Sequence, residues 1–75
     1  MTLTMAVKGR ELIVSKIIGH DEIRLRLASM GFVSGAKCAL VNEINGNLIA
    51  MIKDTRIALD KSLGNRIIVR QEESG

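Results

Sequence analysis

The sequence predicts a mainly β fold, a small and partly open antiparallel barrel of five short strands with one short α-helix between the first and second strands. Short runs rich in β-branched and aliphatic residues recur along the chain, and tight-turn signals such as Asn45-Gly46 separate them. One amphipathic stretch, from Asp21 to Gly31, interrupts these runs. The 75 residues suffice for a single domain, which we place at 1–75 with a frayed polar tail at 71–75.

Turn-forming residues bound each predicted strand. The first strand, 11–18, alternates so that both of its faces are partly apolar, which suits a barrel strand or a strand covered by a helix. Asn45-Gly46 predicts a type I′ hairpin turn, and Asp54-Thr55 predicts the next tight turn. Asp60 is expected to cap a short helical turn that Gly64 ends. The other strands are predicted at 37–42, 48–53, 56–59 and 66–70.

The predicted helix starts with Asp21 as its N-cap. Ile23, Leu27 and Met30 follow at helical spacing and form one apolar stripe that would pack on the barrel. Leu25 lies nearly opposite this stripe at about 100° per residue, so it is either a second packing contact or an exposed apolar residue.

Gly31, Phe32 and Gly35 form the predicted corner between the helix and the second strand. Gly31 is expected to end the helix in a left-handed conformation, and Gly35 to supply the positive φ of a turn. Phe32 is the single aromatic residue of the chain and is expected to plug the junction of helix and barrel. These residues would serve function indirectly, by holding the helix at a fixed angle.

The composition argues against a nucleic-acid-binding protein. The net charge is +3, the basic residues are scattered, and there is no Tyr or Trp on which bases could stack. We therefore expect no nucleic-acid partner. Nucleic-acid binding stays as an alternative function, because a fold can gather scattered charges on one face.

The cellular compartment is indicated by two further features. Cys38 is the single cysteine, which excludes an intrachain disulfide and fits a reducing cytoplasm. No apolar run approaches the roughly 18–20 residues that span a bilayer. We therefore expect a cytoplasmic protein.

The sequence contains no pattern typical of an active site. The serines lack a GxSxG context, and the glycines lack the order of a phosphate-binding loop, so we expect no enzyme. His20 and Cys38 are weak candidates for a metal site, because the chain has no CxxC or HxxxH spacing. The alternative interpretation makes His20 part of the helix start and Cys38 a small buried hydrophobic residue.

Two basic pairs offer candidate binding residues. Arg24 and Arg26 flank Leu25 on the outer half of the helix, and Arg66 and Arg70 share a face of the last strand. Ordinary solvation explains such charges. A functional interpretation is a basic rim around an apolar centre at Leu25, which suits a protein partner.

Residues 24–41, RLRLASMGFVSGAKCALV, resemble the signature of the FeoA family, small cytoplasmic proteins of bacterial ferrous iron transport. The match runs from the basic helix through the Gly31-Phe32 corner and the Gly35 turn into a strand, although Ser34 stands where the family usually has proline. The resemblance continues in the hairpin at 45–49, the strand at 56–59 and the strand at 67–69.

The resemblance implies an SH3-like barrel that acts as an accessory or regulatory module of ferrous iron uptake. Its expected partner is the cytoplasmic G domain of a FeoB-type membrane Fe²⁺ transporter, contacted by Arg24, Leu25 and Arg26. An iron-dependent transcriptional regulator is the alternative, because such repressors carry a similar barrel. The resemblance implies a cytoplasmic protein that reaches the inner membrane through its partner. It leaves open whether the chain binds Fe²⁺ or another divalent metal, which is not required, and whether it forms a homo-oligomer.

Overall fold

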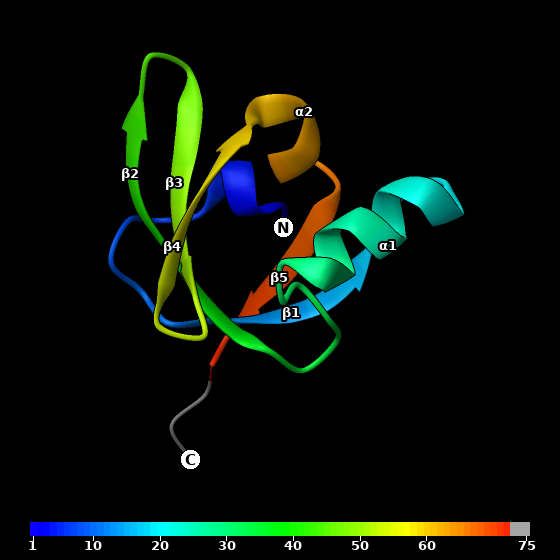
Figure 1. The fold of residues 1–75 in the computed structure, drawn as a ribbon. Helices are drawn as coiled ribbons and strands as arrows, with labels where there is room; N and C mark the ends of the chain where they lie inside the picture. The colour runs from blue at the N-terminus through cyan, green and yellow to red at the C-terminus, as the bar shows by residue number, and fades with distance from the viewer. Residues whose placement is uncertain (73–75) are drawn as a thin grey trace.

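The computed structural model describes residues 1–72 and confirms a mainly β fold with one helix between the first two strands (Figure 1). The sheet is antiparallel throughout, in the order β4-β3-β2-β1-β5. A short 3₁₀ helix, η1 (Leu3–Met5), opens the chain, α1 (Asp21–Ser29) follows β1, and α2 (Lys61–Gly64) precedes β5. The strands are β1 (Leu12–Ile17), β2 (Lys37–Ile44), β3 (Asn47–Ile52), β4 (Thr55–Asp60) and β5 (Ile67–Gln71).

Register shifts in β1 and β2 help the sheet to curve into a barrel. The shift in β1 falls between Val14 and Lys16, where it pairs with β5, and β2 has another where it pairs with β3. An extra residue in a strand reverses the face to which later side chains point. Ile17 therefore packs against the core together with Leu12 and Val14. The strict alternation predicted for 11–18 implies that Ile17 lies on the face opposite Leu12 and Val14, and that part of the prediction is wrong.

Side chains from all five strands, η1, α1 and the loop after α1 meet in one hydrophobic core. Phe32 is the largest fully buried side chain, so the single aromatic residue fills the interior next to α1. Apart from Cys38, the other members of the buried cluster are aliphatic. The buried cluster comprises Leu3, Leu12, Val14, Leu27, Phe32, Cys38, Leu40, Leu48, Ala50, Ile52, Leu59, Ile67 and Val69.

Helix α1 ends in a Schellman motif that directs Phe32 into this core. The Gly31 N–H donates to the Ala28 carbonyl at 2.9 Å, and the Phe32 N–H donates to the Leu27 carbonyl at 3.0 Å. Gly31 has a φ of 106°, a conformation that side-chain-bearing residues rarely adopt. The motif brings Phe32 and Leu27 together, and both are fully buried. The end of α1 and the barrel core are thus one packed unit.

The loop after Phe32 is joined to β1 by hydrogen bonds. Gly35 has a φ of 88°, and the Ala36 N–H donates to the Val33 carbonyl at 3.0 Å to close the turn. The Gly35 N–H donates to the Val14 carbonyl at 2.8 Å, and the Ser34 hydroxyl donates to the Ser15 carbonyl at 3.1 Å. The corner therefore fixes where β2 begins relative to β1.

The start of α1 differs from the prediction. Asp21 is the first helical residue, and His20, with extended backbone, holds the N-cap position without a side-chain cap hydrogen bond. The prediction of Asp21 as the N-cap is therefore wrong. Its carboxylate still lies in the first turn, where the helix dipole favours negative charge, and 3.9 Å from the Arg24 guanidinium.

Of the two predicted hairpin turns, one is confirmed and one is shifted by a residue. Asn45 and Gly46 have φ values of 52° and 79°, which fit the predicted type I′ turn. The next turn is made by Lys53 and Asp54, with φ values of 49° and 61°, and Thr55 already belongs to β4. The Lys53-Asp54 turn has the same left-handed pair of residues, although it contains no glycine.

Helix α2 is capped by Asp60 and ends at Gly64, both as predicted. The Asp60 Oδ1 atom accepts a hydrogen bond from the Leu63 N–H at 2.8 Å. Gly64 is the last helical residue, and Asn65 follows it in right-handed conformation. A Cβ on Gly64 would collide with the Leu48 side chain and lie 2.7 Å from the Thr4 Oγ1 atom. Gly64 is therefore also needed for close packing.

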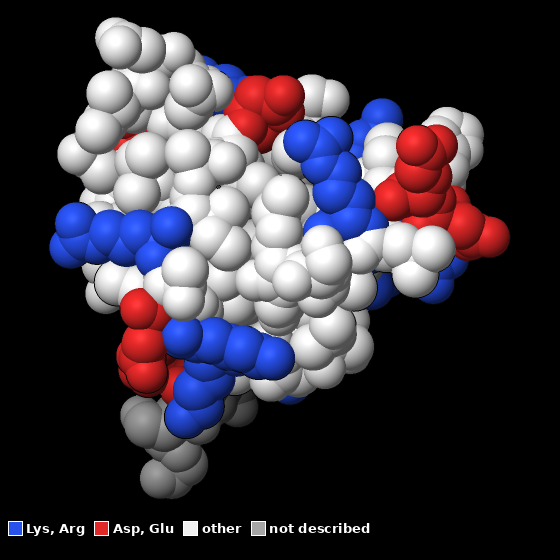
Figure 2. Space-filling view, viewed as in Figure 1, with Lys and Arg blue, Asp and Glu red and all other residues white. Residues whose placement is uncertain are grey.

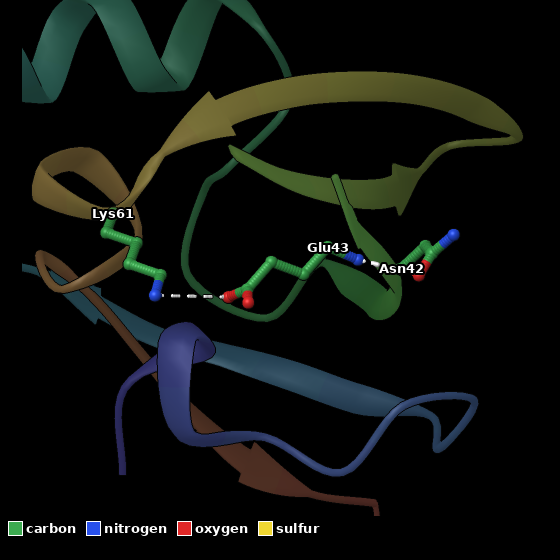
Figure 3. Close-up of polar contacts among 3 residues, drawn as sticks. All are labelled: Asn42, Glu43 and Lys61. Atoms are coloured by element: carbon green, nitrogen blue, oxygen red, sulfur yellow. Dashed lines mark hydrogen bonds and ion pairs between the residues drawn. The ribbon is translucent and has the colours of Figure 1, made fainter. Parts of the chain in front are cut away.

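An ion pair links α2 to the hairpin of β2 and β3. The Lys61 Nζ atom lies 3.5 Å from the Glu43 carboxylate of β2, as Figure 3 shows. The Glu43 N–H in turn donates to the Asn42 Oδ1 atom at 2.8 Å. Both ends of the ion pair are partly exposed, so its contribution to stability is small.

Both termini of the described chain pack on β1 and β5. The Val69 N–H donates to the Met1 carbonyl at 2.8 Å, and Thr2 bridges to Ile68, so the N-terminus covers the outer edge of β5. At the other end Gln71 still belongs to β5, which corrects the start of the predicted frayed tail. Glu72 forms an ion pair with Lys37 at 3.2 Å. Residues 73–75 of the predicted tail lie outside the described residues.

Replacement of Gly64 by alanine should destabilise the fold. The added methyl must displace the Leu48 side chain or the Thr4 hydroxyl, and overpacking of this kind costs about 1–3 kcal/mol. The measurement is the free energy of unfolding in urea. Ser62→Ala, on the exposed surface of the same helix, is the matched control and should change that free energy by less than about 0.5 kcal/mol. Equal stability of Gly64→Ala and the wild type would contradict the close approach.

Gly31→Ala should cost more stability than Gly35→Ala. Both positions have positive φ, so alanine is strained at each by roughly 1–3 kcal/mol. At Gly31 the new Cβ also lies 3.2 Å from Ile52 Cγ1, whereas at Gly35 it meets no atom within 4 Å. Thermal and urea unfolding of the two variants would measure the difference, and a larger loss at Gly35 would contradict the packing described for the corner.

Candidate interaction site on helix α1

Helix α1 is attached to the barrel by a narrow part of its surface. Leu27 is its one fully buried residue, with Ile23 and the following Met30 packed partly against the core. Its N-terminal end projects from the body of the molecule (Figure 1). Most of the helix is therefore available to a partner.

A groove runs between α1 and the neighbouring strand β1. Its volume is about 670 Å³, and it is open to solvent along its length. Leu25 lies on this groove with 71% of its surface exposed, so the sequence alternative of a second packing contact is excluded. The lining residues are Ser15, Lys16, Ile17, Asp21, Arg24, Leu25, Ala28 and Ser34.

The three residues proposed from sequence as partner contacts do not all line the groove. Arg24 and Leu25 do, whereas Arg26 is exposed on the helix but is not among the groove residues. Of the two arginines, Arg24 lies near an acidic residue, with its guanidinium 3.9 Å from the Asp21 carboxylate. The basic flanks of Leu25 thus differ, because one borders the groove and the other lies beside it.

Sequence reasoning missed the groove residues that lie outside this triplet. Asp21, Leu25 and Ala28 follow one another at spacings of four and three residues and share a helical stripe, so helical periodicity could have indicated Ala28. Lys16 and Ser34 come from β1 and from the loop after α1. No local signal in the sequence marks these two residues, because the folding of the loop onto β1 brings them to the helix.

The candidate metal ligands belong to different parts of the structure. His20 is exposed at the N-cap of α1, whereas Cys38 is buried in β2, opposite Leu12 of β1 and Ile52 of β3. Burial raises the pKa of the Cys38 thiol to about 11, so the neutral thiol predominates at neutral pH. Within residues 1–72, no group of three or more His, Cys, Asp or Glu side chains is placed to hold a metal ion.

Charged side chains are dispersed over the face shown in Figure 2. Basic groups are spread over several parts of this face, acidic groups lie at the projecting end of α1, and a broad uncharged area occupies the centre. Arg66 precedes β5 and does not belong to it, whereas Arg70 lies within the strand.

Among the helices of the described chain, none has the length and apolar character needed to cross a membrane.

Two comparisons with known sequences point to the same family. The sequence model of the FeoA domain matches residues 1–71. Over 73 residues the chain is 36% identical to a protein of Methanocaldococcus jannaschii named Fe(2+) transport protein A, and the match covers 97% of this chain and 89% of that protein.

Solved structures agree with the sequence comparison. A crystal structure of the iron uptake regulatory protein FeoA matches with a TM-score of 0.88 and 30% identity, over 96% of each chain. The zinc complex of FeoA from Stenotrophomonas maltophilia, described as a prokaryotic SH3 domain protein, matches with a TM-score of 0.81 and 28% identity. That match covers 93% of this chain and 89% of the other. With the domain model spanning nearly the whole chain and the barrel shared throughout, this protein belongs to the FeoA family.

Proposed function

We propose that this FeoA-family protein is an accessory module of ferrous iron uptake, and that α1 docks on the cytoplasmic G domain of a FeoB-type Fe²⁺ transporter. The exposed Leu25 on the α1 groove is the observation that carries the proposal. The family and the Fe(2+) transport protein A relative support the role in iron transport. The iron is then the cargo of the transporter, and the module acts through contact.

Leu25 has the properties of an anchor for a protein partner. A large aliphatic side chain that is 71% exposed gains free energy when a partner removes it from water. The groove beside it can receive a side chain of the partner, and burial at the centre of a contact is where interface residues contribute most. This arrangement favours a protein surface as the ligand.

The charged groups around Leu25 would orient the partner. Arg24 and Lys16 give the groove two cationic borders, and Arg26 adds a cation on the other side of the helix. Asp21 partly offsets Arg24, so the local positive potential is moderate. Such rim charges steer encounter and set orientation more than they add affinity. We therefore expect an acidic complement around an apolar pocket on the G domain.

The proposed docking on a membrane transporter implies a place of action for the protein. The proposed location is the cytoplasm, at the inner membrane when the module is bound to its partner. The zinc in the Stenotrophomonas maltophilia relative was bound to that protein, whereas His20 and Cys38 of this chain occupy separate places in the fold. The proposal therefore assigns no step to a metal held by this chain.

The test is an NMR titration of isotope-labelled protein with the isolated G domain of the cognate transporter, under anaerobic conditions with and without Fe²⁺. We expect amide shifts concentrated in α1 and at Lys16 and Ser34 across the groove. Shifts confined to other parts of the barrel would overturn the assignment of the docking face. Iron-dependent shifts at His20 or Cys38 in the absence of the G domain would overturn the metal-free mechanism.

Leu25→Glu should weaken docking by about tenfold or more while leaving the fold intact, because it places a charge at the apolar centre of the contact. Affinity would be measured by calorimetry, and stability by urea unfolding. Ile44→Glu is the matched control, since Ile44 is also exposed but lies at the end of β2, in the hairpin away from α1 (Figure 1). Unfolding by Leu25→Glu, or equal losses of affinity in both variants, would contradict the proposal.

A further inference from the structure

The two edges of the sheet are treated differently by the rest of the chain. The outer edge of β5 is covered, because Met1 and Thr2 pair with it. In the part of the chain that the structure describes, the outer edge of β4 has no strand beside it. An uncovered edge strand offers its backbone groups to another chain.

The register of β4 shows which of its backbone groups are free. The turn at Lys53-Asp54 has two residues, so the flanking Ile52 and Thr55 form a hydrogen-bonded pair. Along the hairpin, pairs that exchange backbone hydrogen bonds alternate with pairs that do not. Arg56 and Ala58 therefore direct their N–H and C=O groups away from β3, as Asp60 directs its N–H. Within residues 1–72, the outward backbone groups of Arg56 and Ala58 have no hydrogen-bond partner in the loops or side chains.

The side chains of this edge alternate cleanly. Leu59 is buried and Ile57 packs against the core, whereas Arg56, Ala58 and Asp60 are exposed and lie on one face. The edge therefore presents a cation, a small apolar residue and an anion in that order. The small residue is at the middle, where a facing strand would approach.

We propose that β4 pairs with β4 of a second copy of this chain, antiparallel and about a twofold axis at Ala58. In this register Ala58 faces its counterpart, and Arg56 of each copy faces Asp60 of the other. In this register the two Ala58 residues exchange both backbone hydrogen bonds, and the Asp60 N–H of each copy donates to the Arg56 carbonyl of the other. The ten strands of the two copies then form one continuous sheet, twice the five in each chain.

Charge selects this occupant over a strand of unrelated sequence. Opposite charges directly across an antiparallel pair stabilise it, and like charges destabilise it. Because Arg56 and Asp60 have opposite sign and are equally spaced from Ala58, the edge is complementary to itself. Asp60 Oδ1 already caps α2, which fixes the carboxylate near the edge and leaves its second oxygen for the arginine of the other copy. None of the residues lining the α1 groove belongs to β4.

Sedimentation velocity of the full chain over a wide range of protein concentration tests the pairing. The wild type should change from monomer to dimer, and Arg56→Glu should raise the dissociation constant at least tenfold, because two acids then face each other at both ends. Lys8→Glu makes the same change of net charge at an exposed loop position and should dimerise as the wild type does. A monomeric wild type at every concentration, or equal dimerisation by Arg56→Glu, would overturn the proposal.

A mixing experiment tests the register itself. Asp60→Lys should also fail to dimerise, because it places two cations face to face, but an equimolar mixture with Arg56→Glu should form a heterodimer with opposite charges restored at both ends. Failure of the mixture to associate, with both variants folded by their amide spectra, would overturn the register.

Amide hydrogen exchange in the wild type gives a readout that does not depend on any variant. Exchange at Arg56 and Ala58 should slow as the protein concentration rises, because pairing covers their outward N–H groups. Exchange at Ile57 and Leu59 should change little by direct pairing, since their N–H groups already face β3. Slowing at α1 with none at β4 would place the self-contact elsewhere and overturn the proposal.

Discussion

The Schellman hydrogen bond from the Phe32 N–H to the Leu27 carbonyl is the interaction on which the arrangement of this protein depends. Phe32 directly follows Gly31, Leu27 is the fully buried residue of α1, and both belong to the buried core, so this hydrogen bond joins the helix to the barrel core. The backbone reversal at Gly31 makes the contact possible, since it turns the chain inward within one residue of the helix end. Helix, corner and core are therefore positioned together.

This anchoring explains how a short polar helix remains ordered. A helix of nine residues is unstable by itself in water, so α1 depends on tertiary packing at its C-terminal end. Because the anchor is narrow, most of the helix surface stays free, including Leu25 and its two flanking arginines. A small domain can in this way present a rigid contact surface without diverting residues from its core.

The barrel gives the two ends of the sheet different properties. The N-terminal residues complete β5, whereas among residues 1–72 β4 has its hairpin partner on one side and no strand on the other. Natural proteins protect such edges with charge, and on β4 the charges are of opposite sign around Ala58. If that edge is paired with a second copy, a protein with one exposed helix per chain would present two such helices to its partners.

The sequence alone determined the features that arise from local geometry. Alternating and helical periodicity predicted the five strands and the helix, Asn45-Gly46 predicted its turn, and Asp60 predicted its cap, because each depends on neighbouring residues only. Tertiary structure decided the rest, including the reversal of faces in β1, the tight approach of Gly64 to Leu48 and the meeting of Lys16 with Leu25 across a groove. These depend on segments distant in the chain, which no local pattern brings into contact.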